Sequence, residues 1–442
     1  MGKILGLAVL LSAAAVLAEV PSAMAVRNAR VVTVAGSPLA HGTVVWRNGL
    51  IEAVGENIAI PPDAWVIEGE GLTVYPGLID GMSTLGITDE SALPLPPAPP
   101  PGSGRGSQQQ PQQSQPVRGP EDRPMTTSWL KAADLVKSTD TRIAGARNAG
   151  FTTAVTFPMR GIFAGQGAVI NLAGDRPGKM VVASPVGQFL TFITPNVGSF
   201  PGSLMGAFAY VRQIYLDVDH YRMAKQMYAK NPSGMARPDY DRALEGAMES
   251  ERVLLPAQRV VDIDRMIRFA GELKLKPVLY GVPTGYAAAD LLVKSGVPVL
   301  VSLKWPARPR DADPDRIDTL KALRLFEDAP RTPKTLAASH VKFGLYSDGI
   351  TRRTDLWKAV KRAMEAGLSA DEAVRAFTLS NAEIFGVADR LGSIEKGKIA
   401  NLLITNGDLF EENTRVQWVI VDGRKFEPVP EPAPAGDREE TR

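Results

Sequence analysis

Thr73-Val74-Tyr75-Pro76-Gly77-Leu78-Ile79-Asp80-Gly81-Met82-Ser83-Thr84 is the stretch of this sequence that decides the fold. Its first residues are β-branched and aromatic, a pattern that predicts a buried strand. Pro76-Gly77 interrupts the run, and the apolar pair Leu78-Ile79 then leads to Asp80. We therefore expect a buried strand, a break, and a short apolar segment that presents a carboxylate.

Strand-like and helical patterns alternate downstream of this stretch, from Thr141 to Phe385. Short β-branched or aliphatic runs predict the strands Phe151–Phe157, Val253–Pro256, Pro277–Tyr280, Val297–Val301 and Val341–Tyr346. Amphipathic segments between them predict helices, the longest of them marked by Leu204, Phe208, Val211, Tyr215 and Val218 at three- and four-residue steps. This alternation favours a parallel α/β barrel, whose active site lies at the C-terminal ends of the strands.

Short strands separated by turns occupy both ends of the chain. Asn48-Gly49 predicts a hairpin turn near the start, and the strands Ile399–Ile404 and Val416–Val421 come near the end. Strands at both ends of an alternating middle predict one small β-sandwich domain, built from residues 26–75 and 391–427.

The wording Pro76-Gly77-Leu78-Ile79-Asp80 resembles the first barrel strand of the metal-dependent amidohydrolase superfamily, in its imidazolonepropionase-like and dipeptidase-like branch. Gly392–Lys398 and Val421-Asp422-Gly423 are also close to the family's usual wording. The resemblance implies a TIM-like (β/α)8 barrel over residues 76–390, bracketed by the sandwich. It also implies zinc or another divalent metal and hydrolysis of carbon–nitrogen bonds.

The metal ligands that the resemblance implies are mostly replaced in this chain. The first-strand His pair falls on Met82 and Thr84, the fifth-strand His on Pro256, and the sixth-strand His on Gly281. The eighth-strand Asp, the family's acid/base position, is retained as Asp348. The resemblance thus implies Asp348 as the catalytic residue of a centre that has lost its histidines.

The histidine count supports this interpretation. Only His41, His220 and His340 occur, and there is no Cys, so a multi-histidine zinc site is not expected and Cys sites are excluded. We therefore expect no cofactor. One alternative is a hard cation held weakly by Asp80, Asp348 and an acid such as Glu90. In the other alternative Asp80 caps a turn and Asp348 pairs with a cation.

Several polar residues are candidates for ligand binding at the barrel mouth. Lys304 ends the seventh strand, where it either reaches Asp348 or is exposed to solvent. The remaining candidates are Arg160 and Gln166 in the loop Met159–Gly167, Tyr280 at a strand end, and Ser83 and Thr84 after Asp80. Arg160 can hold a carboxylate bidentately, Tyr280 either faces the mouth or packs in the core, and turn formation is the alternative for the loop. No His is placed to activate a strand-end serine.

The N-terminal 25 residues have the pattern of a secretory signal peptide. Lys3 precedes the apolar run Ile4–Ala18, and Ala23-Met24-Ala25 is a small-x-small signal, so we expect cleavage after Ala25 and a secreted or periplasmic protein. An uncleaved anchor is the alternative. No other apolar run is long enough for a membrane span, and the net charge of +2 gives no argument for nucleic-acid binding.

Two segments have the composition of disordered chain. Residues 91–125 are rich in Pro, Gly, Ser and Gln, and form either an inert spacer or a lid or docking segment at the mouth. Residues 428–442 form a polar tail.

Two functional hypotheses follow from this sequence. In the first, the chain is an exported, non-catalytic binding or partner subunit, associated with an intact amidohydrolase or with further copies of itself. In the second, it is an active hydrolase of non-peptide or dipeptide carbon–nitrogen bonds with an atypical site.

Overall fold

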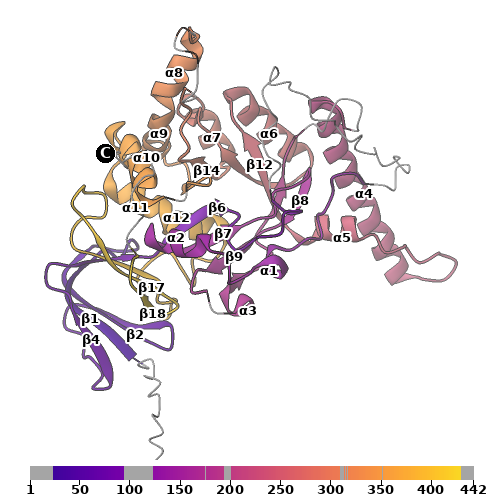
Figure 1. The fold of residues 1–442 in the computed structure, drawn as a ribbon. Coiled ribbons are helices and arrows are strands. Elements are labelled where there is room, and N and C mark those ends of the chain that lie inside the picture. Colours follow the sequence, from indigo (N-terminus) through magenta and orange to yellow (C-terminus); the bar gives the residue numbers. More distant parts are fainter. Residues whose placement is uncertain are drawn as a thin grey trace, which may run out of the picture.

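The computed structural model describes residues 23–93, 123–174, 176–193, 201–308, 313, 315, 317–350 and 352–429. Most of the predicted leader, residues 94–122 of the Pro/Gln-rich insert and the tail after Val429 lie outside these ranges. The strands form three sheets, and most helices pack around the two that follow the N-terminal strands (Figure 1). The fold is α/β, as predicted. No helix among the described residues combines the length and the apolar character that crossing a membrane requires.

Both ends of the chain build one eight-stranded sheet, as expected for a domain formed from both termini, but the predicted β-sandwich is not confirmed. Its strands are β1 (Ala23–Val31), β2 (Leu39–Arg47), β3 (Leu50–Gly55), β4 (Ala64–Glu68), β5 (Thr73–Pro76), β16 (Leu402–Thr405), β17 (Val416–Val421) and β18 (Arg424–Phe426). Their order is β18-β17-β16-β5-β1-β2-β3, with β4 also paired to β1. The N- and C-terminal strands meet where β5 pairs antiparallel with β16. The predicted Asn48-Gly49 turn joins β2 to β3, and both residues have positive φ, at 50° and 83°.

The second sheet has four strands in the order β10-β9-β7-β6. They are β6 (Leu78–Ser83), β7 (Phe151–Thr156), β9 (Ala168–Asn171) and β10 (Val181–Ala183). The predicted break at Pro76-Gly77 separates β5 from β6, so the sequence stretch that carries Asp80 contributes to two sheets. β6 and β7 are parallel, whereas β9 runs antiparallel to β7.

The third sheet has six strands in the order β15-β14-β13-β12-β11-β8. They are β8 (Phe163–Gln166), β11 (Gln188–Leu190), β12 (Arg252–Ala257), β13 (Lys276–Gly281), β14 (Val299–Ser302) and β15 (Phe343–Tyr346). β11 to β15 are parallel, whereas β8 is antiparallel to β11. The all-parallel arrangement expected from the sequence is therefore replaced by mixed sheets, because part of the segment predicted as the loop Met159–Gly167 forms the strand β8.

Gly167 joins β8 to β9 and so links the two α/β sheets on one side. A side chain at this position would collide with the ring of Phe157, so the bend between the two strands needs glycine. On the other side β6 lies beside β15, and the buried Asn381 connects them. Its Nδ2 donates to the carbonyl oxygens of Ile79 at 2.8 Å and Leu345 at 2.9 Å. Among the described residues no backbone ladder joins β6 to β15, so the two sheets do not close into one continuous hydrogen-bonded barrel.

Helices and 3-10 turns cover these sheets. Their bounds are α1 (Ala132–Leu135), α2 (Arg142–Asn148), α3 (Pro177–Met180), α4 (Leu204–Lys230), α5 (Arg242–Glu249), α6 (Val260–Glu272), η1 (Gly285–Ala287), α7 (Ala289–Ser295), α8 (Leu320–Asp328), η2 (Ala329–Arg331), α9 (Thr332–Ala338), α10 (Arg353–Glu365), α11 (Ala370–Phe377) and α12 (Leu379–Phe385). Val211, Tyr215 and Val218 of the predicted long helix are buried in α4. The largest apolar cluster lies between the sheets and these helices.

Candidate functional site

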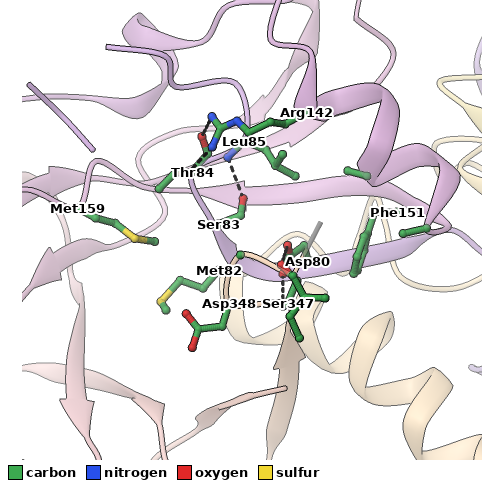
Figure 2. Close-up of a pocket in the computed structure, with 14 residues that line it drawn as sticks. Asp80, Met82, Ser83, Thr84, Leu85, Arg142, Phe151, Met159, Ser347 and Asp348 are labelled. Atoms are coloured by element: carbon green, nitrogen blue, oxygen red, sulfur yellow. Dashed lines mark hydrogen bonds between the residues drawn. The ribbon is translucent and has the colours of Figure 1, made fainter. Parts of the chain in front are cut away.

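A cavity of about 210 Å³ lies where β6 and β15 end, at the edge expected to carry the active site. Its walls are built from the end of β6, the turn after β15, the helix α2 and the start of β7 (Figure 2). The residues that line it are Asp80, Met82, Ser83, Thr84, Leu85, Arg142, Ala146, Ala149, Phe151, Met159, Ser347, Asp348, Gly349 and Ile350. Of the candidates predicted from sequence, the structure brings together Ser83, Thr84, Met82 and Asp348.

Asp80 is almost fully buried and is bound by the turn after β15. The backbone N–H of Ser347 donates to Oδ1 at 2.9 Å, and the Ser347 hydroxyl donates to Oδ2 at 2.6 Å. Burial raises the pKa of Asp80 to about 6, although these hydrogen bonds and one from the N–H of Met82 lower it. Asp80 is therefore a carboxyl group that changes protonation close to neutral pH, and it connects the second sheet to the third.

Asp348 directly follows Ser347 in the sequence. It lines the cavity and is exposed to solvent. Its φ of 50° places it in the left-handed region, which turns its side chain out of the strand direction. The hydroxyl of Ser302 donates to Asp348 Oδ2 at 2.7 Å. Lys304 is exposed, and among the described residues no ion pair joins it to Asp348. Of the two alternatives for Lys304, exposure to solvent is the one found, and Ser302 is the hydrogen-bond partner of Asp348.

Comparison with known proteins adds to this geometry. Residues 289–425 match the Amidohydrolase family. The solved structure of an amidohydrolase from Thermotoga maritima MSB8 superposes with a TM-score of 0.72 and 24% sequence identity, covering 91% of this chain and 100% of that one. The resemblance to the amidohydrolases is confirmed. At this identity, the likeness to the Thermotoga structure shows a shared fold.

Two curated relatives match over shorter stretches. An adenine deaminase from Moorella thermoacetica is 33% identical over 109 residues, which are 25% of this chain and 15% of that protein. An N-acetylglucosamine-6-phosphate deacetylase from Haemophilus influenzae is 39% identical over 70 residues, which are 16% of this chain and 17% of that protein. The matches span less than a fifth of either relative, so they support an amidohydrolase relationship and not a particular reaction.

The amidohydrolase histidine positions of the first strand are occupied by side chains with other partners. The Met82 thioether is buried in an apolar cluster that includes Ile79 and Tyr346. The hydroxyl of Thr84 accepts a 2.9 Å hydrogen bond from Nη1 of Arg142. Neither position supplies a nitrogen ligand, and both side chains already take part in packing or hydrogen bonding.

The amidohydrolase positions of the fifth and sixth strands do not supply a ligand either. Pro256 and Gly281 pair with β13 and β12 inside the parallel sheet. Gly281 has φ of 92°, and a Cβ built there would lie 2.5 Å from Nε2 of Gln258. An imidazole at this position would need both a strained backbone and movement of Gln258. The residues present therefore do not fit the multi-histidine metal centre that the resemblance implies.

The three histidines lie in other parts of the molecule. His41 is on β2, where Nδ1 is 3.0 Å from Oδ1 of Asn28, His220 is exposed on α4, and His340 precedes β15. None of them lines the cavity. Within the described ranges, no group of three or more His, Cys, Asp or Glu side chains is arranged to hold a metal ion.

The other predicted mouth residues do not line the cavity. Gln166 is fully buried and donates from Nε2 to the carbonyl oxygens of Ser128 and Gly246, so it holds α5 against the sheets. Tyr280 donates to the carbonyl of Leu190 at 3.0 Å, and burial raises the pKa of its phenol. Nη1 of Arg160 donates to the carbonyl of Glu90 at 3.0 Å.

The sequence interpretation missed Arg142 and Asn381. Arg142 starts α2 and binds both oxygens of Asp140 together with Thr84, so it forms one wall of the cavity. The motif Asp140-Thr141-Arg142 at a predicted helix start was the available signal. No sequence signal marks Asn381, because its partners are carbonyl groups of strands far away in the chain.

Proposed function

We propose that this chain is an exported amidohydrolase-like binding protein whose cavity takes up a small ligand without a multi-histidine metal centre. The proposal rests on the residues that stand at the amidohydrolase family's metal-ligand positions. Met82 is packed, Thr84 is hydrogen-bonded to Arg142, and Gly281 leaves no room for an imidazole. The barrel-like arrangement of β6, β7, β9 and β11 to β15 supports the same proposal, since the fold presents a cavity at the strand ends.

The cavity indicates the chemistry of its ligand. Its mouth carries the Asp348 carboxylate, and the hydroxyls of Ser83, Ser347 and Thr84 lie nearby, while Met82, Leu85, Phe151, Met159 and Ile350 supply apolar surface. A cavity of about 210 Å³ is smaller than most drug-sized pockets. A small molecule with an apolar body and a protonated amine, such as a small amino compound, matches a carboxylate at the rim of an apolar cavity.

A hydrolase with an atypical site is the second candidate. The short Ser347–Asp80 hydrogen bond favours it, because a carboxyl group that titrates near pH 6 can accept a proton from a neighbouring hydroxyl. The two curated relatives are named a deaminase and a deacetylase, so both of those proteins are named as enzymes, which is consistent with a hydrolase. In this chain, however, both oxygens of Asp80 are already hydrogen-bonded to Ser347.

Metal analysis and ligand binding on the same purified protein test the proposal. We expect no stoichiometric transition metal, no turnover of dipeptides or N-acyl amino acids with or without added zinc, and thermal stabilisation by small amines. Asp348→Asn should abolish that stabilisation while leaving the melting temperature of the free protein unchanged within about 2 °C. Stoichiometric zinc together with metal-dependent turnover would overturn the proposal, as would turnover lost in Ser347→Ala.

A further inference from the structure

A second and larger cavity, of about 870 Å³, lies between α10 and the loop that joins β16 to β17. In Figure 1 this loop and α10 lie next to one another at the side of the molecule opposite α4. We call it the α10 groove. Its walls are formed by Asn148, Arg353, Thr354, Trp357, Lys358, Lys361, Leu409, Phe410, Glu411, Glu412, Thr414, Arg415, Val416, Pro428 and Val429. None of these residues belongs to the cavity around Asp348.

The α10 groove has an aromatic floor and a basic wall. Trp357 and Phe410 meet edge to face, with ring centroids 5.4 Å apart. Lys358 and Lys361 are exposed one turn apart on α10, and within the described part of the chain neither forms an ion pair. Glu411 and Glu412 lie on the opposite loop and are exposed. The groove therefore offers aromatic surface together with separate positive and negative sides.

The described chain ends inside this groove. Pro428 and Val429 are part of its lining, and the side chain of Asn148 holds the backbone of Val429 from both sides. Asn148 Nδ2 donates to the Val429 carbonyl at 3.1 Å, and the Val429 N–H donates to Asn148 Oδ1 at 3.1 Å. Asn148 therefore fixes Val429, the last described residue, in the wall of the groove.

The sequence that follows Val429 matches the groove in chemistry. Pro430-Glu431-Pro432-Ala433-Pro434 alternates proline with small or acidic residues, and Asp437, Glu439 and Glu440 follow. Proline-rich segments bind aromatic-lined grooves in an extended conformation at a low cost in conformational entropy. Glu431 is two residues beyond Val429, which is about 7 Å of extended chain. Lys358 and Lys361 line the same groove as Val429.

We propose that residues 430–442 fold back into the α10 groove, with Pro430–Pro434 against Trp357 and Phe410 and with Glu431 beside Lys358 and Lys361. The short connection gives the segment an effective concentration in the millimolar range, so even a weak intrinsic affinity keeps it bound. The groove is then a docking site for acidic proline-rich segments that its own chain occupies. The other proline-rich stretch, residues 94–101, contains no acid and is the natural comparison.

Disulfide trapping tests this directly, because the chain contains no Cys. In the full chain, Lys361→Cys combined with Glu431→Cys should form an intramolecular disulfide under mild oxidation. The matched control combines Lys294→Cys, on the exposed part of α7, with Glu431→Cys and should remain reduced. Equal trapping of both pairs, or a disulfide found only between two molecules, would overturn the proposal.

Peptide binding provides a second measurement that does not depend on oxidation. A labelled peptide of residues 428–442 should bind a chain that ends at Val429 at least tenfold more tightly than it binds the full chain. Lys358→Glu with Lys361→Glu should weaken this binding about tenfold, and Glu431→Lys in the peptide should restore it. Lys294→Glu with Lys321→Glu is the control for total charge. A peptide of residues 94–101 that binds equally well, or equal affinity for both chain lengths, would contradict the assignment.

Discussion

The hydroxyl of Ser347 donates a 2.6 Å hydrogen bond to the buried carboxylate of Asp80. Asp80 lies on β6, in the second sheet, and Ser347 follows β15, in the third. A side-chain contact therefore joins the two sheets at the point where no backbone ladder of the described residues does. Asp80 and Ser347 also line the candidate cavity, so this carboxyl group contributes both to the contact between the sheets and to the shape of the site.

Asp80 gives the stability a predictable dependence on pH. Because burial raises its pKa to about 6, from about 3.9 for an exposed Asp, the folded protein holds this proton more tightly than the unfolded chain. Its favourable contribution is complete below about pH 4 and is lost as the pH rises through about 6, at a cost of about 3 kcal/mol. In urea unfolding, the stability of wild type relative to Asp80→Asn should therefore fall between pH 4 and pH 7.

Asp140 is the matched control, since its pKa moves the other way. Burial alone would raise the pKa of Asp140. The hydrogen bonds from Arg142 and from the N–H of Gly86 outweigh burial, so the net effect is a lowered pKa. Its contribution should be present at neutral pH and be lost as the pH falls below its ordinary range. A wild-type stability that rises from pH 4 to pH 7 relative to Asp80→Asn would contradict our account of Asp80.

Replacing Asn381 should loosen the contact between β6 and β15. Asn381→Leu leaves the buried carbonyl oxygens of Ile79 and Leu345 without donors, which should cost about 2 to 4 kcal/mol of unfolding free energy. Gly344→Ala should also be destabilising, because its new methyl group would collide with Oδ1 of Asn381 and displace this amide. Chemical denaturation measures both, and a loss below about 1 kcal/mol in Asn381→Leu would show that the amide is not needed at this contact.

Gly281 should resist substitution. Gly281→Ala places a methyl group 2.5 Å from Nε2 of Gln258 on a backbone with φ of 92°, so we expect a loss of about 1 to 3 kcal/mol. Gly271→Ala on α6 is the control, because a methyl group there meets open space and should be neutral or stabilising. Gly281→His should show the same loss and should not create zinc binding. A stable, zinc-loaded Gly281→His protein would contradict the proposed reason for the missing ligand.

The position of leader cleavage is the fourth prediction. Ala23, Met24 and Ala25 are buried, and they pair with Arg47, Trp46 and Val45 of β2. Cleavage after Ala25, as expected from the small-residue signal, would remove these three residues from β1. If the leader is cleaved, we therefore expect mass spectrometry of the mature protein to find an N-terminus upstream of Ala23, for example at Glu19, after Val16-Leu17-Ala18. A mature chain that begins at Val26 and is as stable as one that begins at Glu19 would contradict this expectation.

Local patterns predicted much of this fold. The Asn48-Gly49 turn, the break before β6, the apolar spacing of α4 and the carboxylate of Asp80 all depend on neighbouring residues, and each is found where it was expected. The pairing of strands was harder to predict. β8 runs antiparallel because Gly167 lets one stretch of chain pass from one sheet to the other, and that choice depends on packing against Phe157.

The residues of the candidate site were predicted only in part. The resemblance placed Met82, Thr84 and Asp348 at strand ends of one fold, and in the structure all three line the same cavity. Gln166 was expected at the mouth and is buried instead, because its amide donates to the carbonyl groups of Gly246 in α5 and of Ser128 in the segment before α1. Such long-range hydrogen bonds leave no periodic trace in a sequence.

The pairing of β5 with β16 also determines when this molecule can finish folding. Residues 73–76 meet residues 402–405, so the edge of β5 that does not pair with β1 has no neighbour until almost the whole chain has left the ribosome. Contacts this distant in sequence form late, after the loop between them has been closed. The sheet built from both termini is therefore completed only at the end of synthesis, and a chain that stops before residue 402 leaves one edge of β5 exposed.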